Sequence, residues 1–358
     1  MKRIDELDKN FKLSTKIDRE GLAFYDSKEE PFTVHGLIRE GDMWVRVPEK
    51  IARTVSPGVH VLSKVSSGGR LRFVTDSPYV AIKTVQPEKD QLDLMPMTGM
   101  VGFDLYVGEG KGATYVNTFR PPVTPCEGYE SVIDISPVRE RRLITIHFPL
   151  YGGVNELYIG LKEDSIVEKA EPYAYSTSFV YYGSSITMGG CATRPGMTYQ
   201  SILSRRFDAD YISLGFSGNA LGEREIAQYA ASLDMSLFVL DYDHNAPNAE
   251  HLEKTHEPFF LAVREKHPDI PIIILPRPHA KVTEDDLRVK VIRKTYENAI
   301  ARGDKNVYYI PSKELMSICG ADGTVDNCHP TDFGFYSMAE RISLEIEKII
   351  ADGKLKKN

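Results

Sequence analysis

A serine at a sharp turn, with an aspartate and a histidine near the C-terminal end, could carry out nucleophilic chemistry. Residues 179–182 (FVYY) suit a buried strand, 183–185 (GSS) suit a turn, and 186–188 (ITM) look like a first helical turn. A hydroxyl on such a turn lies at the carboxyl edge of a sheet, and its own N–H points the same way. That geometry suits a nucleophile whose N–H helps to hold an oxyanion. Taken alone, the stretch fits an ordinary turn with a serine cap equally well.

A serine nucleophile needs a base, and the base needs an acid that orients it. Asp326 and His329 lie three residues apart, so on a loop or a first helical turn the carboxylate and the imidazole can reach one another. An Asp-x-x-His pair is common and usually has no catalytic meaning by itself. Oxyanion donors are also required. Gly218 offers an unobstructed backbone N–H and Asn245 a side-chain amide, although a turn residue and a helix cap explain these two as well.

These residues all fall in the second half of the chain, where the pattern predicts an α/β domain over residues 173–358. Apolar segments alternate there with helical stretches, at 178–182, 211–214, 237–241, 272–275 and 307–310. This pattern predicts a parallel sheet covered on both faces, a three-layer flavodoxin-like arrangement. One helix is expected to be capped by Thr283 and a last one to span about 335–350. Ligands bind at the carboxyl ends of such strands, so the loops that follow them predict one site.

The first half, residues 1–172, has a different periodicity. Short segments in which apolar and polar residues alternate include 43–47, 70–74, 79–83 and 143–147, and glycine-rich turns separate them. Regularly spaced short strands of this kind predict an antiparallel β-sandwich of the jelly-roll type.

The order and spacing of four loops resemble the SGNH (GDSL-type) hydrolase family across about half the chain. The loops are GSSIT, GFSGN, DYDHN and DNCHP, at 183–187, 215–219, 241–245 and 326–330. Separately, GFDLY at 102–106 resembles the G-x-D-L-Y signature of a β-sandwich domain that precedes some SGNH esterases. Two signatures in the expected order are far more specific than either alone.

The resemblance implies a role for each matching residue. Ser185 would be the nucleophile, His329 the general base and then acid, and Asp326 its orienting carboxylate. The N–H groups of Ser185 and Gly218 and the amide of Asn245 would form the oxyanion hole. No metal and no organic cofactor is implied. A leading sandwich is often a carbohydrate-facing module, so the expected substrate is an O-acyl ester, in particular an O-acetyl ester, of a sugar or glycan.

Two positions depart from the family pattern. The usual aspartate before the nucleophile is Ser184 here, and the third block reads Asp-His-Asn-Ala instead of Gly-x-Asn-Asp. His244 could therefore add a polar group to the pocket, but a solvent-facing side chain is the favoured interpretation. Arg194 and Arg277 are candidate substrate contacts, with surface or ion-pair arginines as the alternative.

Other readings of the same residues stay open. Ser217 lies in a loop that falls one glycine short of a G-x-S-x-G elbow, and Ser184 is a second outside candidate for the nucleophile. Asp241 and Asp243 follow a strand as D-x-D, which resembles the first motif of magnesium-dependent haloacid-dehalogenase phosphatases. A third hypothesis is a non-catalytic protein that binds glycans.

Composition limits the partners. Hydrophobic residues make up 42% of the 358 residues and charged residues 27%, and the net charge of −7 argues against nucleic acid and membranes as partners. Residues 1–8 lack the apolar core of a signal peptide, so a cytoplasmic location is expected for the sequence as written, or export if a leader was removed. The four cysteines, Cys126, Cys191, Cys319 and Cys328, form no C-x-x-C pair, so a structural zinc site is not expected and buried or incidental thiols are the default. A homo-oligomer is compatible with the sequence.

Overall fold

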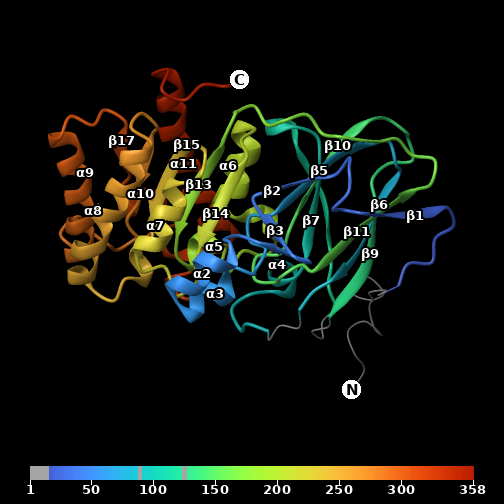
Figure 1. Cartoon of the computed structure of the whole chain (residues 1–358), viewed down its shortest axis with the longest axis horizontal. Helices are drawn as coiled ribbons and strands as arrows, with labels where there is room; N and C mark the ends of the chain where they lie inside the picture. The colour runs from blue at the N-terminus through green and yellow to red at the C-terminus, as the bar shows by residue number, and fades with distance from the viewer. Residues whose placement is uncertain (1–15, 88–90, 123–126) are drawn as a thin grey trace.

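The structure is a computed structural model that describes residues 16–87, 91–122 and 127–358, so Cys126 and residues 1–8 lie outside the described part. An antiparallel sandwich lies beside a three-layer α/β domain, as Figure 1 shows. Both predicted architectures are therefore present. The predicted boundary at residues 172 and 173 falls in the connection between the last sandwich strand, β12 (Val167–Glu168), and the first strand of the parallel sheet, β13 (Ser178–Gly183). The boundary itself stays a prediction.

The parallel sheet carries the predicted site residues at its edge. Its strand order is β14-β13-β15-β16-β17, and every neighbouring pair is parallel. The other four strands are β14 (Tyr211–Gly215), β15 (Met235–Asp241), β16 (Ile272–Ile274) and β17 (Val307–Tyr309). All five agree with the predicted apolar segments to within two residues at either end.

Helices cover both faces of this sheet because successive strand residues point to opposite sides. Phe179 and Tyr181 of β13 pack with α6 (Tyr199–Phe207) and α11 (Asp332–Ala351). Val180 and Tyr182 pack with the helices of the other face. These are α7 (Arg224–Ala231), α8 (Ala249–Lys266) and α9 (Leu287–Ala301), and the short α5 (Ser185–Met188) and α10 (Ser312–Leu315) complete the domain.

The expected start of α9 is wrong by one turn. Thr283 does not cap this helix, which begins at Leu287 after the N-cap residue Asp286. Asp286 accepts hydrogen bonds from the N–H groups of Arg288 and Val289 at 2.9 and 3.3 Å. Residues 283–286 form a separate turn, because the N–H of Asp286 bonds to the carbonyl of Thr283.

Two antiparallel sheets form the sandwich. One has the order β1-β11-β6-β9 and the other β12-β5-β10-β7-β8, with β2 also paired to β5. Their inner faces contribute Leu71, Phe73, Ile82 and Ile159 to one buried core. The strands are β1 (Leu22–Asp26), β2 (Thr33–His35), β5 (Arg70–Thr75), β6 (Tyr79–Val85), β7 (Phe103–Val107), β8 (Thr114–Phe119), β9 (Gly128–Asp134), β10 (Arg142–His147) and β11 (Glu156–Lys162).

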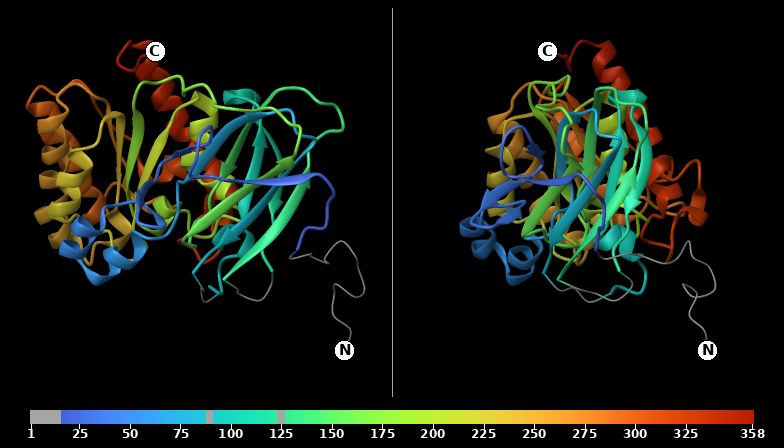
Figure 2. Two further views of the ribbon diagram at one scale, coloured as in Figure 1. Left: turned by 45° about the vertical axis from the view of Figure 1, so that its right-hand side comes forward. Right: turned by 90° about the vertical axis from the view of Figure 1, so that its right-hand side faces the viewer.

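Part of the first half packs on the α/β domain instead of the sandwich. A small hairpin, β3 (Ile38–Glu40) and β4 (Met43–Val45), leads into α2 (Glu49–Val55) and α3 (Pro57–Leu62). The helix α2 lies beside α7 and α3 beside α2, as the blue helices of Figures 1 and 2 show, and the buried residues of both join the hydrophobic core of the α7 face. A further short helix is α4 (Met97–Met100). Within the described residues, no helix has the length and apolar character to cross a membrane.

Candidate active site

Ser185 is the first residue of α5 and follows β13 directly. The serine cap that the sequence left open is present, but Ser184 forms it. The Oγ of Ser184 accepts the N–H of Ile186 at 3.2 Å, which leaves the Oγ of Ser185 available for another partner. Only glycine fits at position 183, because a Cβ there would collide with the side chain of Thr187 and the carbonyl of Asp241.

Ser185, His329 and Asp326 form a continuous hydrogen-bonded chain. The Oγ of Ser185 lies 2.9 Å from the Nε2 of His329, and the Nδ1 of His329 lies 2.7 Å from the Oδ2 of Asp326. Ser185 is only 6% exposed, whereas the side chains of His329 and Asp326 are 27% and 28% exposed. The chain of groups therefore runs from the edge of the core to the surface, where a substrate can approach.

Asp326 is held by its own loop as well as by the imidazole. Its Oδ1 accepts the backbone N–H groups of His329 and Cys328 at 2.7 and 3.0 Å. Burial alone would raise the pKa of Asp326, but these bonds and the bond from the His329 ring lower that pKa below its ordinary value. An ionised carboxylate therefore fixes the ring with Nδ1 as the donor, so that Nε2 can accept the serine proton.

The strand register places the starts of the three predicted oxyanion loops next to one another at the same edge of the sheet. Gly183 is paired with Gly215 of β14 on one side and with Asp241 of β15 on the other. The loops that carry Ser185, Gly218 and Asn245 thus begin side by side at the carboxyl edge, the usual location of ligand sites in such sheets.

The two candidate donors outside the nucleophile turn have conformations that suit the role. Gly218 adopts φ +68°, and no atom lies within 4 Å of its Cβ position, so the chain there is open. The Oδ1 of Asn245 accepts the N–H of Ala220 at 3.3 Å, so the amide nitrogen of Asn245 is not used in this bond and can serve as a donor to an oxyanion. That bond also ties the third loop to the second.

Two residues of the first half reach this edge, and no sequence pattern pointed to either. Arg46 is buried, and its Nη1 donates to the carbonyls of Ser213 and Gly215 at 3.2 and 2.5 Å. Its other nitrogens donate to the carbonyls of Val65 and Leu62. Burial lowers the pKa of Arg46 to about 9, which leaves it protonated at neutral pH. The guanidinium thus fixes the end of β14, from which the Gly218 loop begins.

Tyr151 is the second residue from the first half. Its hydroxyl donates to the Oγ of Ser217 at 3.3 Å. A Cβ on Gly190 would lie 2.9 Å from the same hydroxyl, 3.1 Å from the carbonyl oxygen of Ser185 and 3.5 Å from the ring of His329. Tyr151 therefore borders both the nucleophile turn and the Gly218 loop. The glycines that follow it predicted only a turn.

His244 is half-buried, so the favoured expectation that it faces solvent is wrong. Its Nδ1 lies 3.6 Å from the Sγ of Cys328, and its buried Nε2 has no hydrogen-bond partner among the described residues. Burial lowers its pKa to about 4, and the charges of Arg277 and Arg288 act in the same direction. A neutral imidazole therefore stands against the loop that carries Asp326 and His329.

Arg194 and Arg277 are both engaged in ion pairs. Arg194 donates to the buried Asp104 at 2.8 Å and to the hydroxyl of Tyr106 at 2.7 Å. Asp104 and Tyr106 belong to the GFDLY segment, so this segment holds the loop that follows α5. Arg277 lies 2.7 Å from Asp286 and 3.5 Å from Asp243.

The two carboxylates of the phosphatase hypothesis have separate partners. Asp241 is 2% exposed, and its Oδ2 accepts the hydroxyls of Thr187 and Tyr199 at 3.1 and 3.2 Å. Burial raises the pKa of Asp241 to about 8, so it is mostly protonated at neutral pH. Asp243 is buried too and pairs with Arg288 at 2.7 Å. This arrangement does not suit a nucleophilic carboxylate beside a second metal-binding one.

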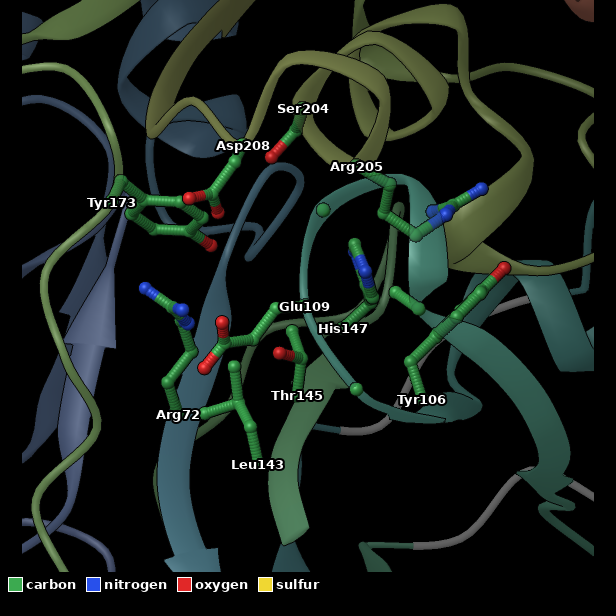
Figure 3. A pocket seen from close by; sticks show the side chains of 13 residues that line it. Arg72, Tyr106, Glu109, Leu143, Thr145, His147, Tyr173, Ser204, Arg205 and Asp208 are labelled. Atoms are coloured by element: carbon green, nitrogen blue, oxygen red, sulfur yellow. The ribbon is translucent and has the colours of Figure 1, made fainter. Parts of the chain in front are cut away.

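A separate cavity lies where the sandwich meets α6, as Figure 3 shows. Its lining includes Arg72, His147, Tyr173 and Arg205, and no predicted catalytic residue contributes to it. Its volume of 20 Å³ suffices for about one water molecule. The cavity is thus a feature of the interface and not of the Ser185 site.

Family models match both halves of the chain. A model of the GDSL-like lipase/acylhydrolase family matches residues 176–347, and a model described as the N-terminus of Esterase SGNH hydro-type matches residues 22–167. A comparison with curated protein sequences finds no match.

Solved structures match nearly the whole chain. A crystal structure described as a GDSL-like lipase of Bacteroides ovatus is 30% identical, with a TM-score of 0.81 over 94% of this chain and 99% of that one. The salicylyl-acyltransferase of a tetracycline biosynthetic pathway is 19% identical, with a TM-score of 0.75 over 93% and 98%. An acetyl xylan esterase of the rumen bacterium Butyrivibrio proteoclasticus is 13% identical, with a TM-score of 0.59 over 92% and 99%. The last two similarities show the fold alone.

Proposed function

The chain belongs to the GDSL-like lipase/acylhydrolase family and is an acyl esterase, and from this premise we propose that it removes O-acetyl groups from a carbohydrate. In this proposal Ser185 is the nucleophile, His329 the general base and acid, and Asp326 the orienting carboxylate. The single observation that carries it is the chain of two hydrogen bonds, 2.9 and 2.7 Å long, that links these three side chains.

The proposed reaction has two halves. His329 takes the proton of Ser185 as the Oγ attacks the ester carbonyl, and the negative charge that develops is held by the N–H groups of Ser185 and Gly218 and by the amide of Asn245. His329 then gives this proton to the departing sugar oxygen, which leaves as a hydroxyl. A water molecule, activated by the same imidazole, releases acetate from Ser185. Asp326 stays ionised throughout and stabilises the imidazolium.

A short acyl group is supported by the space beside the nucleophile. The hydroxyl of Tyr151 closes the side on which Gly190 lies, because even a methyl group there would lie within 2.9 Å of it. The loop that carries Tyr151 is held by Ser66, whose Oγ lies 2.9 and 2.8 Å from the carbonyl oxygens of Pro149 and Gly152 and shares its proton between them. An acyl chain that extends toward Gly190 would have to displace this loop.

A carbohydrate as the alcohol is supported by analogy with the acetyl xylan esterase of the same two-domain fold. The net charge of −7 argues against nucleic acid and an anionic membrane as partners. A homo-oligomer is compatible with this proposal.

Activity toward acetylated sugars and nitrophenyl esters of two to eight carbons tests the proposal. Wild type is expected to prefer acetyl esters, and Ser185→Ala to lose at least about 10³-fold in kcat. Ser217→Ala is the matched control, since it removes the rival hydroxyl from the adjacent loop, and it should lose only about fivefold in kcat/KM, through the hydrogen bond from Tyr151. Adding methanol to the same assay and measuring methyl ester formation would show whether the acyl group is also transferred to an alcohol instead of water.

Three outcomes would contradict the proposal. If Ser185→Ala were active and Ser217→Ala inactive, Ser217 and not Ser185 would be the nucleophile. Phosphatase activity that a chelator abolishes would favour the Asp241 hypothesis. Glycan binding without hydrolysis of any ester would favour the non-catalytic one.

A further inference from the structure

We propose that Asp326, Cys328 and His329 form a binding site for a thiophilic divalent cation such as Zn²⁺, and that the bound cation switches the esterase off. The inhibition rests on the proposed function, whereas the binding does not. Each of these residues offers one ligand atom, and the three atoms lie within 4.8 Å of one another. A carboxylate, a thiol and an imidazole are the three side chains that zinc takes most often in proteins.

The loop geometry holds these three residues in place. Asp326 accepts the backbone N–H groups of both Cys328 and His329, so the loop is closed around its own carboxylate. An isolated bridge between Thr324 and Pro330 closes the base of the loop. Ligand atoms around a tetrahedral zinc lie about 3.3 to 3.6 Å apart, given metal distances of ~2.0 to 2.3 Å. The present spacing, at most 4.8 Å overall and 2.7 Å between the Nδ1 of His329 and the Oδ2 of Asp326, lies on either side of this range.

His244 approaches the same thiol. Its Nδ1 lies 3.6 Å from the Sγ of Cys328, and its Nε2 is buried without a hydrogen-bond partner among the described residues. Three protein ligands leave one position of a tetrahedral zinc open. After a shift of the ring, His244 can take that position, and a water molecule can take it otherwise.

Binding would change the proton arrangement that the proposed mechanism needs. The Nδ1 of His329 now carries a proton toward Asp326, and a metal ion would replace this proton between the two side chains. The imidazole proton then moves through solvent to Nε2, and the thiol of Cys328 releases its proton to water as it becomes a thiolate ligand. One proton leaves for each cation bound. With Nε2 protonated, His329 donates to Ser185 and can no longer act as its base.

The binding arm of the test uses Co²⁺ and the Ser185→Ala variant, so it does not depend on activity. Cobalt bound by a thiolate gives a near-ultraviolet charge-transfer band together with intense visible bands typical of tetrahedral coordination. We expect these bands at a 1:1 ratio, their displacement by Zn²⁺, and their loss when Cys328→Ser is added. Cys191→Ser is the matched control, since it removes another thiol and should leave the bands unchanged. Absence of the bands in Ser185→Ala would overturn the proposal, as would their persistence after Cys328→Ser.

The activity arm measures esterase rates over a range of free Zn²⁺. We expect saturating zinc to lower the rate at least tenfold, with full recovery on addition of a chelator. In Cys328→Ser, compared with its own zinc-free rate, the half-inhibitory concentration should rise at least tenfold, while Cys191→Ser should match wild type. Equal inhibition of wild type and Cys328→Ser would overturn the switch. A protein that binds cobalt as expected but hydrolyses no ester would instead contradict the proposed function alone.

Discussion

The hydroxyl of Tyr151 lies 3.3 Å from the Oγ of Ser217, so a residue of the first half of the chain borders the loop that carries Gly218. The same hydroxyl closes the space next to Gly190, beside the nucleophile turn. A residue outside the α/β half therefore borders the candidate site. The sandwich contributes to the shape of that site as well as to the stability of the chain.

Tyr151→Phe should lower kcat/KM about fivefold without a large change in melting temperature. The ring still packs in this variant, and a neutral hydrogen bond contributes about 1 kcal/mol. Tyr151→Ala should in addition raise the ratio of butyrate to acetate hydrolysis, because it opens the space beside Gly190. Tyr158→Phe, on the sandwich strand β11, is the control. An unchanged acyl preference in Tyr151→Ala would show that this side chain does not limit the acyl group.

Asn245→Ala should reduce kcat by about 10²–10³ with little change in KM. The reason is that the side-chain amide of Asn245 binds the oxyanion, which exists in the transition state and not in the bound substrate. Steady-state kinetics with an acetyl ester measure this. Asn248→Ala is the matched control: Asn248 caps α8 by accepting the N–H of His251 at 2.8 Å, so its loss should affect stability and not turnover. Near-normal turnover of Asn245→Ala would remove this residue from the oxyanion hole.

Arg46→Met should destabilise the protein by about 3–5 kcal/mol and also lower kcat. The carbonyls of Leu62, Val65, Ser213 and Gly215 would lose a buried donor, and the start of the Gly218 loop would lose its support. Arg46→Lys should rescue little, because an ammonium cannot reproduce the planar fork of donors. Arg53→Met, in an exposed pair with Glu49, serves as the control. Urea denaturation measures the loss of stability, and steady-state kinetics measure the loss of kcat.

Asp210 should make stability pH-dependent in the acid range. It pairs with Arg70 and, at 3.4 Å, with His35, both from the sandwich. Burial opposes ionisation of Asp210, but the charge of Arg70 and the hydrogen bond with His35 lower its pKa from 3.8 to about 2. Because the folded pKa is depressed, the stabilisation is complete above pH ~4 and is lost as the pH falls toward 2. It amounts to about 2 kcal/mol.

Urea midpoints at pH 7 and pH 2.5 check this expectation. Asp210→Asn should be much less stable than wild type at pH 7, and the difference should shrink at pH 2.5. Asp164→Asn removes an exposed partner of Arg139 and should change stability by less than about 1 kcal/mol at pH 7. A difference between Asp210→Asn and wild type that does not vary with pH would contradict the assigned ionisation.

Much of the fold could be predicted because its signals are local. Apolar residues on successive positions of 178–182 mark a strand buried on both faces, and the structure has β13 there. The pairing of Asp326 with His329 was also within reach, since three residues of loop can bring the two side chains together without help from elsewhere. The start of α9 was missed because Thr283 and Asp286 both suit a cap, and the ion pair with Arg277 favours the second.

What the tertiary structure alone decided depends on groups far apart in the chain. The distance between Ser185 and His329 follows from packing across 144 residues. The burial of His244 depends on the loop that carries Cys328, 84 residues away. Arg46 and Tyr151 reach the site from the first half, and the residues next to them in the sequence do not indicate this. A local sequence pattern indicates which face of a strand or helix a side chain occupies, but not which distant loop it contacts. The sequence thus determined which residues stand at the ends of which strands, and the packing of two domains determined what surrounds them.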